Sequence, residues 1–370
     1  MDGHGGAARG VLDARVRRRT ALRIFGAACV GTALARPGWS LAQASGDPYV
    51  VVELGTGDGD WSRAFGITNR GQVLWSWGTA LDPARGLVND PRVGIWDRGD
   101  VTDLSARGIE RGVAIVDDGT VLGARLDQAL RYRPDVGAPE PVPGFLHDAY
   151  PAGMNATGAV VGNVEGRPVV SGPNGISERP TPTGYGFFQP AAIDARGAVA
   201  GTVRAGRTDE SGQRAALLDG GQSLVLDPAP GADSSGAADL NDEGLLAGGP
   251  GRFGMHSMVA AGRAFVFDAS TGMMTDIGSL PGYRNSVAMA INNAGQVVGA
   301  AWHPLDEVAP FRRAFRYDHR TGAMTDLTVA VGLPPGAVVV DAFDINDGGE
   351  IAAQIDDGGQ RRGVVLRPAA

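Results

Sequence analysis

Residues that could bind or transform a ligand are concentrated in a few loops rich in aromatic and charged side chains. The segment 75–92 begins WSWG, and the segment 301–312 reads AWHPLDEVAPFR. Aromatic rings beside carboxylates and arginines on one surface suit a sugar or a peptide. The candidate ligand-binding residues are Trp61, Trp75, Trp77, His256, Tyr283, Trp302, His303 and Arg312. The alternative is that the tryptophans only pack the interior, as aromatic side chains more often do.

No sequence motif for catalysis is present: the chain has no Gly-x-Ser-x-Gly, no His-Glu-x-x-His and no Walker sequence. We therefore predict no catalytic residue and no cofactor. Asp306 and Glu307 keep a secreted hydrolase or lyase open as an alternative, because glycosidases use two acids facing a cleft. We predict no metal site, since no histidine has a second one at ligand spacing, and only His256 and His303 lie in neighbouring loops.

A rigid scaffold must hold such loops, and it is visible in the sequence as an internal repeat. Seven copies of a pattern typified by AMAINNAGQVVG (288–299) recur with a mean spacing of about 46 residues. Their aligned glycines are Gly71, Gly119, Gly158, Gly197, Gly244, Gly295 and Gly349.

Each copy predicts a β-hairpin. Val or Ile alternates with small residues on either side of the turn, which is typical of strands. An Asn or Asp opens the turn, and the glycine after it takes the left-handed conformation that the turn needs. The residues predicted to open the turns are Asn69, Asp117, Asn155, Asp194, Asn241, Asn292 and Asn346.

A second pair of strands follows each hairpin, most clearly in 263–280 and 313–327. Four strands per repeat at this period indicate propeller blades. The last repeat ends at RGVVLRPAA without a fourth strand, and YVVVELGTG (49–57) resembles a fourth strand without a blade. We predict an all-β fold, a seven-bladed β-propeller closed by pairing of the N-terminal strand with the last blade, which removes an open edge. An open solenoid or a two-sheet sandwich would not need that strand.

Residues 1–44 are predicted to be an export signal that is removed. Arg18 and Arg19 fit the twin-arginine form, and Ala42 and Ala44 fit an Ala-x-Ala cleavage site. The apolar run is far short of ~20 residues, so we expect no stable membrane insertion after processing. Residues 45–370 then form one propeller domain of an exported protein, periplasmic or extracellular. The single cysteine, Cys29, lies in the removed segment.

The charge of the chain argues against one class of partner. The formal net charge is −8, and removal of 1–44 would make it −13. Nucleic acid is a poor ligand for such a surface.

The repeats of 237–353 resemble bacterial extracellular repeats known as the HAF family, after a His-Ala-Phe signature. The resemblance covers about 48–370, but the signature histidine is replaced by Arg263 and Arg313, and the phenylalanine is kept at Phe265 and Phe315. It implies an exported repeat protein and transfers no catalytic residue. The predicted function is therefore that of a binding module for a glycan, a peptide or a protein. A structural cell-surface protein without a small ligand is a further alternative.

Overall fold

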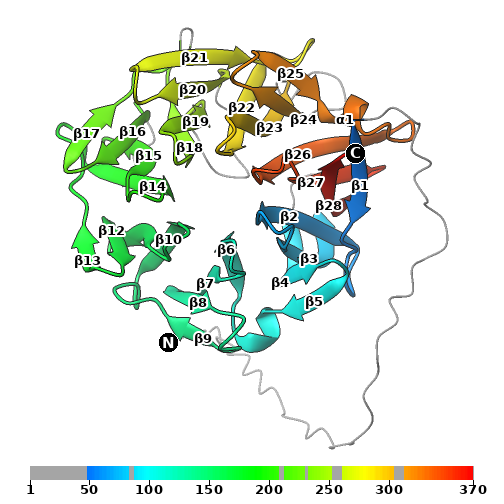
Figure 1. Cartoon of the computed structure of the whole chain (residues 1–370), viewed down its shortest axis with the longest axis horizontal. Helices are drawn as coiled ribbons and strands as arrows, with labels where there is room; N and C mark the ends of the chain where they lie inside the picture. Colours follow the sequence, from blue (N-terminus) through cyan, green and yellow to red (C-terminus); the bar gives the residue numbers. More distant parts are fainter. Residues whose placement is uncertain are drawn as a thin grey trace, which may run out of the picture. The chain divides into compact units, whose positions relative to one another are not determined.

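The seven repeats form seven four-stranded antiparallel sheets that surround a central opening (Figure 1). The structure is a computed structural model, and it describes residues 48–82, 87–207, 212–229, 232–251, 261–303 and 312–369. The prediction of a seven-bladed propeller is confirmed. The export signal predicted for 1–44, with Arg18, Arg19, Ala42 and Ala44, lies outside the described residues.

Each blade is numbered here by its order along the chain. Blade 1 holds β2 (Trp61–Ile67), β3 (Val73–Asp82), β4 (Leu87–Asp97) and β5 (Asp100–Asp103); blade 2 holds β6 (Arg111–Ile115), β7 (Val121–Arg125), β8 (Gln128–Tyr132) and β9 (Pro139–Pro141). Blade 3 holds β10 (Ala149–Met154), β11 (Val160–Val164), β12 (Arg167–Gly172) and β13 (Gly175–Glu178); blade 4 holds β14 (Phe187–Ile193), β15 (Val199–Arg204), β16 (Arg214–Asp219) and β17 (Gln222–Val225).

The remaining three blades include the one that joins the two ends of the described chain. Blade 5 holds β18 (Gly236–Leu240), β19 (Leu245–Gly249), β20 (Ala264–Asp268) and β21 (Met273–Gly278); blade 6 holds β22 (Asn285–Ile291), β23 (Gln296–Trp302), β24 (Arg312–Asp318) and β25 (Ala323–Asp326). Blade 7 holds β26 (Ala337–Ile345), β27 (Ile351–Asp357), β28 (Gln360–Pro368) and β1 (Tyr49–Glu53). Two short helices, η1 (Ser105–Arg107) and α1 (Leu327–Ala330), lie between blades.

Antiparallel pairing sends the connections of every blade to two opposite faces. The first-to-second and third-to-fourth turns lie on one face, which we call the turn face. The second-to-third loops and the links between blades lie on the other, which we call the loop face.

The hairpin turns on the turn face follow the predicted chemistry. All seven aligned glycines have positive φ, between 75° and 89°. In blades 3 to 7 the predicted Asn or Asp accepts backbone N–H groups with its side-chain oxygen; Asn241, for example, accepts from Glu243 and Leu245. The assignment is wrong by one residue in blades 1 and 2, where Gly71 and Gly119 donate to the carbonyls of Thr68 and Val116 rather than of Asn69 and Asp117. Thr68 replaces the Asx side chain with its hydroxyl, which accepts from the N–H groups of Arg70 and Gln72.

The same turn residues join neighbouring blades. The side-chain amides of Asn155, Asn241, Asn292 and Asn346 each donate to the main-chain carbonyl of the equivalent turn residue in the next blade, at 2.7–2.9 Å. This row of bonds is missing where the residue is Thr68, Val116 or Asp194, because none of these side chains has an amide to donate.

A second row uses the following residue of each turn. The backbone N–H of Asp242 donates to Asn293, that of Asn293 to Asp347, and that of Asp347 to Asn69. The N–H groups of Asn69 and Ala195 donate to Asp117 and Asp242 in the same way. Ala156, the equivalent residue of blade 3, has no side-chain oxygen that could accept such a bond. Among the described residues, the seam between blades 2 and 3 is therefore the one that lacks both rows.

A β-bulge at the same place in every innermost strand turns side chains toward the central opening. The register shifts between Ala64 and Gly66 in blade 1 and at the equivalent position of the other six blades. Bulges redirect side chains in this way. The bulged residues are all partly exposed despite their place at the inner edge of the sheets, and they are Phe65, Val113, Ala152, Ala191, Ala238, Met289 and Phe343.

Ring closure is confirmed residue by residue. β1 pairs antiparallel with β28, from Tyr49 opposite Pro368 to Glu53 opposite Val364. Five blades have an ion pair between an arginine in or just before the third strand and an acid on the fourth: Arg92–Asp103, Arg167–Glu178, Arg263–Asp276, Arg313–Asp326 and Arg362–Glu53. In blade 7 the acid comes from β1, so the N-terminal strand supplies the acid that the fourth strand supplies in the other four blades. Arg263 and Arg313, which replace the signature histidine, belong to this set.

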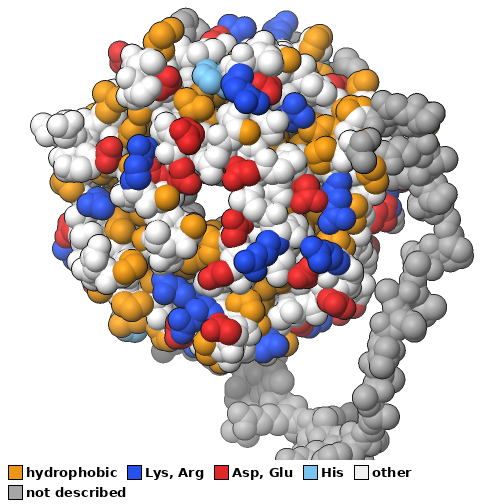
Figure 2. All heavy atoms as spheres, in the orientation of Figure 1, with side chains coloured by type: hydrophobic (Ala, Val, Ile, Leu, Met, Phe, Trp, Pro, Cys, Tyr) orange, Lys and Arg blue, Asp and Glu red, His pale blue; other side chains and the backbone are white. Residues whose placement is uncertain are grey.

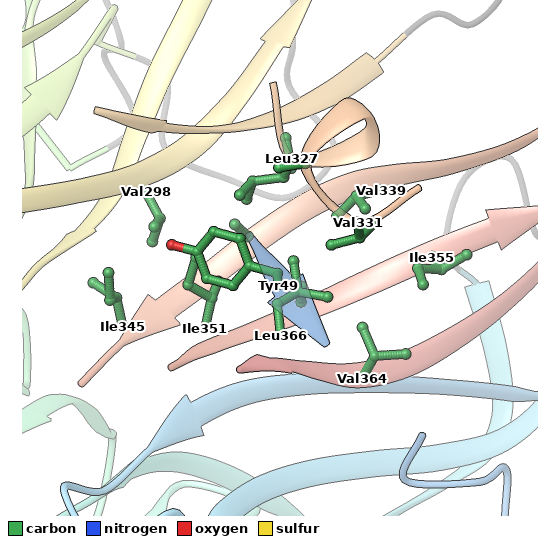
Figure 3. Close-up of a cluster of buried hydrophobic side chains, with 14 of the residues drawn as sticks. Tyr49, Val298, Leu327, Val331, Val339, Ile345, Ile351, Ile355, Val364 and Leu366 are labelled. Carbon is green, nitrogen blue, oxygen red and sulfur yellow. The ribbon is translucent and has the colours of Figure 1, made fainter. Parts of the chain in front are cut away.

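The largest cluster of buried apolar side chains lies around the closing strand (Figure 3). Tyr49 is 2% exposed and packs with Val298 of blade 6 and with Ile351 and Leu366 of blade 7. Its hydroxyl accepts a hydrogen bond from Arg316 of blade 6 at 2.7 Å. Tyr49 therefore ties the closing strand to two blades at once.

Replacement of Tyr49 by alanine should lower the free energy of unfolding by about 3–5 kcal/mol, because a fully buried aromatic side chain is lost from a packed site. The measurement is urea denaturation followed by tryptophan fluorescence. Val50 on the same strand is 39% exposed, so Val50→Ala is the matched control and should cost less than about 1 kcal/mol. Equal effects of the two substitutions would contradict the closing role of Tyr49.

The missing bond at the seam between blades 2 and 3 can be installed. Val116→Asn should raise the free energy of unfolding by roughly 1 kcal/mol, because its amide would reach the carbonyl of the next turn as in the other blades. Asn292→Ala should lower it by about 1–3 kcal/mol, since a buried carbonyl and a turn N–H lose their partners. A thermal melt of both variants tests the pair. If Val116→Asn lost as much stability as Asn292→Ala, the hydrogen bonds between neighbouring turns would not contribute to the stability of the ring.

Candidate functional site

The residues predicted to bind a ligand fall into two groups on the loop face. Trp61, Trp75 and Trp77 belong to blade 1, and Tyr283, Trp302, His303 and Arg312 belong to blade 6 or to the link before it. His256 lies outside the described residues, so the pair it was predicted to form with His303 has no structural description. Blade 7 lies between the two groups (Figure 1).

The tryptophans of blade 1 are interior residues. Trp75 and Trp77 stack with ring centroids 4.5 Å apart, and they are 2% and 4% exposed. The indole N–H of Trp77 donates to Asp58 at 3.2 Å, and the Arg92 guanidinium lies over its ring. Trp61 is 5% exposed. Trp75 and Trp77 pack with Ala352 and Val365 of blade 7, which is the packing role that the sequence left open as the alternative.

The group in blade 6 is more accessible. Tyr283 and His303 are partly exposed and stack with centroids 4.5 Å apart. Arg313, which forms an ion pair with Asp326 at 2.6 Å, also contacts Tyr283. Burial and the Asp326 carboxylate raise the pKa of Tyr283, while Arg313 opposes that rise. Trp302 lies next to His303 in the sequence but is buried, and it pairs across the sheet with Arg312.

Arg312 belongs to a cluster of charges that sequence reasoning missed almost entirely. Its guanidinium forms an ion pair with Asp341 of blade 7, and the two side chains are 13% and 6% exposed. Arg361 of β28 forms an ion pair with Asp356 at 3.2 Å. It also interacts electrostatically with Asp341 and Arg312. Arg63 of blade 1 completes the set and is attracted by Asp341 and repelled by Arg312. Asp341 thus forms an ion pair with Arg312, and the charges of Arg361 and Arg63 also act on this buried carboxylate.

Burial disfavours the charged forms of Arg63, Arg312 and Asp341. Burial lowers the pKa of Arg63 to about 10 and lowers the pKa of Arg312, and in both cases a neighbouring arginine adds to the effect. Burial raises the pKa of Asp341, and the three arginines oppose that rise. Three aromatic rings hold the Arg63 guanidinium, with their centroids 5.1–5.9 Å away in Trp61, Phe65 and Phe343.

A signal for two of the missed residues was present in the repeat. The innermost strands RAFGIT (63–68) and DAFDIN (341–346) align without a gap, which places Arg63 and Asp341 at equivalent positions of neighbouring blades. In blade 6 the same position holds Val287, so opposite charges in adjacent blades depart from the apolar pattern. Arg361 carried a signal as well, because it and Arg312 each directly precede the arginine that pairs with an acid on the fourth strand, Arg362 and Arg313.

A second set of charged side chains, all of them acidic, belongs to the innermost strands of the blades. Acidic side chains surround the opening on the face seen in Figure 2. Asp239 of blade 5 and Asp344 of blade 7 directly follow the bulges, where blades 2, 4 and 6 have alanine. Their carboxylates accept the backbone N–H groups of Ile291 and Ile67, each at 2.8 Å in the next blade.

Both carboxyl groups are harder to ionise than usual. Burial raises the pKa of Asp239 to about 6 and that of Asp344 to about 7, whereas the bonds from the backbone N–H groups oppose the shift. Asp242 adds to the rise at Asp239, and Asp239 adds to the rise at Asp344. The charge of Asp239 in blade 5 therefore contributes to the raised pKa of Asp344 in blade 7.

Two findings concern metal ions and membrane-spanning helices in the described part of the chain. It contains no group of three or more His, Cys, Asp or Glu side chains that could hold a metal ion. In the described segments, no helix has both the length and the apolar character needed to cross a bilayer.

Comparison with known proteins identifies the fold and little else. Residues 222–356 match the family described as "Protein of unknown function (DUF3466)", and no curated protein matches the sequence. The name of the HAF family does not occur in these matches, so that resemblance stays a prediction.

Solved structures with a similar fold belong to several different proteins. The chain is 14% identical to the extracellular domain of BT4673 from B. thetaiotaomicron, with a TM-score of 0.51 over 86% of this chain and 39% of that one. It is 12% identical to the acylaminoacyl peptidase of Pyrococcus horikoshii, with a TM-score of 0.52 over 82% and 52%. For the WD40 repeats of RRP9 the identity is 13% and the TM-score 0.50, over 88% and 98%. The chain thus spans less than two thirds of the first two proteins, and at these identities the likeness concerns the propeller alone.

Stability should fall as the pH rises from about 4 to about 7. In this window the unfolded chain has already released the protons of Asp239 and Asp344, whereas the folded chain keeps them, so the folded state binds more protons. The expected slope is on the order of 1.4 kcal/mol per pH unit for each carboxyl that differs in protonation.

The variant Asp239→Ala/Asp344→Ala, which copies blades 2, 4 and 6, should show a flatter profile. Urea denaturation of both proteins between pH 4 and pH 8 measures the difference. Parallel profiles would show that the two acids titrate normally.

Proposed function

We propose that this protein is an exported β-propeller that binds a ligand through the loop face of blades 6, 7 and 1. The observation that carries the proposal is the charge cluster of Arg63, Arg312, Arg361 and Asp341, which three blades assemble at this face. Such a cluster contributes little to folding, because desolvation of buried charges offsets their attraction. Perturbed ionisable groups of this kind are concentrated at functional sites.

The surroundings of the cluster support a binding role. Tyr283 and His303 provide a partly exposed aromatic pair beside blade 6, and ligand sites combine aromatic surfaces with a few polar groups. Trp61, Trp75 and Trp77 stabilise the blade 1 side from the interior and are no longer proposed as ligand contacts. The ligand is a glycan, a peptide or a protein. An export signal at 1–44 and extracellular domains among proteins of similar fold support a location in the periplasm or outside the cell.

One observation favours an enzyme as the second candidate. Asp239 and Asp344 have raised pKa values, as the acid of a hydrolase or lyase would, and Asp239 adds to the rise at Asp344. However, both oxygens of each carboxylate already accept backbone N–H groups, from Leu240 and Ile291 at Asp239 and from Ile345 and Ile67 at Asp344. These bonds assign the two acids to the joints between blades, so binding is the better supported function.

Glycan and peptide arrays probed with the purified chain should give defined hits, and the hits should weaken at least tenfold in Arg361→Gln. Arg320 is an exposed arginine on the turn face of blade 6, so Arg320→Gln is the matched control and should bind like the parent protein. Incubation of each hit with the protein, followed by mass spectrometry, tests turnover. Blank arrays together with cleavage of a polysaccharide would replace the binding module by the enzyme.

A further inference from the structure

The outermost strand of blade 4 differs from those of the other blades in the part of the chain that the structure describes. β17 is the last strand of its sheet and lies on the outer rim of the ring (Figure 1). Its sequence is QSLV, whereas each of the other outermost strands carries an Asp or a Glu. Charged side chains on an edge strand discourage pairing with another chain. Among the described outermost strands, β17 is therefore the one that lacks this protection.

The repeat shows which charge is missing from β17. In five blades the acid that pairs with the third-strand arginine lies opposite the second residue after that arginine, as Asp326 lies opposite Phe315. The corresponding pair in blade 4 is Ala216 and Val225, so a valine takes the place of the acid. The arginine itself is kept as Arg214, which donates to two main-chain carbonyls.

The backbone of β17 directs the hydrogen-bonding groups of two residues away from its sheet. The N–H of Leu226 donates to the carbonyl of Ala215 in blade 4. Successive residues of an antiparallel strand direct their N–H and C=O groups to opposite sides. β16 and β17 pair without a register shift, so the groups of Leu224 also point to β16. Those of Ser223 and Val225 therefore point outward.

We propose that β17 pairs antiparallel with the β17 of a second copy of this chain, about a two-fold axis at Leu224. In this register Ser223 of each copy lies opposite Val225 of the other, and every outward N–H and C=O group of the two strands finds a partner. Leu224, which is 45% exposed, meets its counterpart in a non-hydrogen-bonded pair, where side chains approach most closely. The same surface is used by both copies, as in most homodimers.

Charge favours a second copy at this edge. Each chain has a formal net charge of −8, so two copies repel one another where their acids meet. Self-pairing of β17 brings no carboxylate into the contact and places leucine against leucine. One short strand pair buries less than the ~1,200 Å² at which standard interfaces begin, so the dimer should dissociate on dilution. Blade 4 contributes no residue to the candidate site, so the dimer is independent of the proposed ligand.

Sedimentation velocity of the full chain over a range of concentrations tests the dimer. We expect a monomer in dilute solution and a dimer in concentrated solution. Val225→Asp should weaken dimerisation at least tenfold, because it places carboxylates of the two copies at diagonal positions about 7–8 Å apart. The new carboxylate can pair with Arg214 as in five other blades, so circular dichroism melts should show no loss of stability. Val101 of β5 is 49% exposed, so Val101→Asp is the matched control and should dimerise like the parent protein.

Cysteine cross-linking tests the register. Leu224→Cys, in a chain that also carries Cys29→Ser, should form a disulfide-linked dimer under mild oxidation, because opposite residues have Cβ atoms about 4.5–5.5 Å apart. Gln222→Cys is the matched control on the same strand. The two Gln222 positions would lie roughly four residues, or about 13 Å, apart along the paired strands, so cross-linking there should be at least tenfold slower.

Other results would overturn the inference in distinguishable ways. If folded Val225→Asp dimerises like the parent protein, β17 is not the interface. If Gln222→Cys cross-links as fast as Leu224→Cys, the register is wrong. If the chain stays monomeric at every concentration and Leu224→Cys does not cross-link, the second copy is excluded. Selection of an extended peptide from a display library, with binding lost in Val225→Asp, would then assign the edge to a strand of another protein.

Discussion

The structure depends on one pairing, that of β1 with β28. Blade 7 receives three strands from the end of the chain and its fourth from residues 49–53. Without that strand the ring would keep an open sheet edge, and every contact between blades 6, 7 and 1 would rest on an incomplete blade. The candidate site draws on these three blades, so the pairing that closes the ring also assembles the site.

The sequence predicted the scaffold well because its signals are local. A glycine that must adopt positive φ, and an Asn or Asp that accepts nearby N–H groups, report on a few residues of backbone and recur in every blade. Where the assignment failed, in blades 1 and 2, an extra acid or amide next to the turn drew the alignment away from Thr68 and Val116. In blade 1 local chemistry could not decide between Thr68 and Asn69, and in blade 2 the apolar Val116 offered no polar side chain to mark the turn.

The site was predicted less well because it depends on which blades become neighbours. Trp75 and Trp77 were chosen for their residue type, but they pack against blade 7, which only the closure of the ring places beside blade 1. Arg63 and Asp341 lie 278 residues apart in the sequence, and only the ring brings them together. Arg312 was identified because it lies beside aromatic residues in the sequence, whereas its ion pair with Asp341 could not be foreseen.

The hydrogen bonds between turns are distributed unevenly around the ring. An unbroken series joins blades 5, 6, 7 and 1, with both rows at each seam and the carboxylates of Asp239 and Asp344 reinforcing the first and the last. The opposite arc is joined by single rows or by none. The half of the ring that holds Arg63, Arg312 and Arg361 is therefore the more heavily cross-linked half.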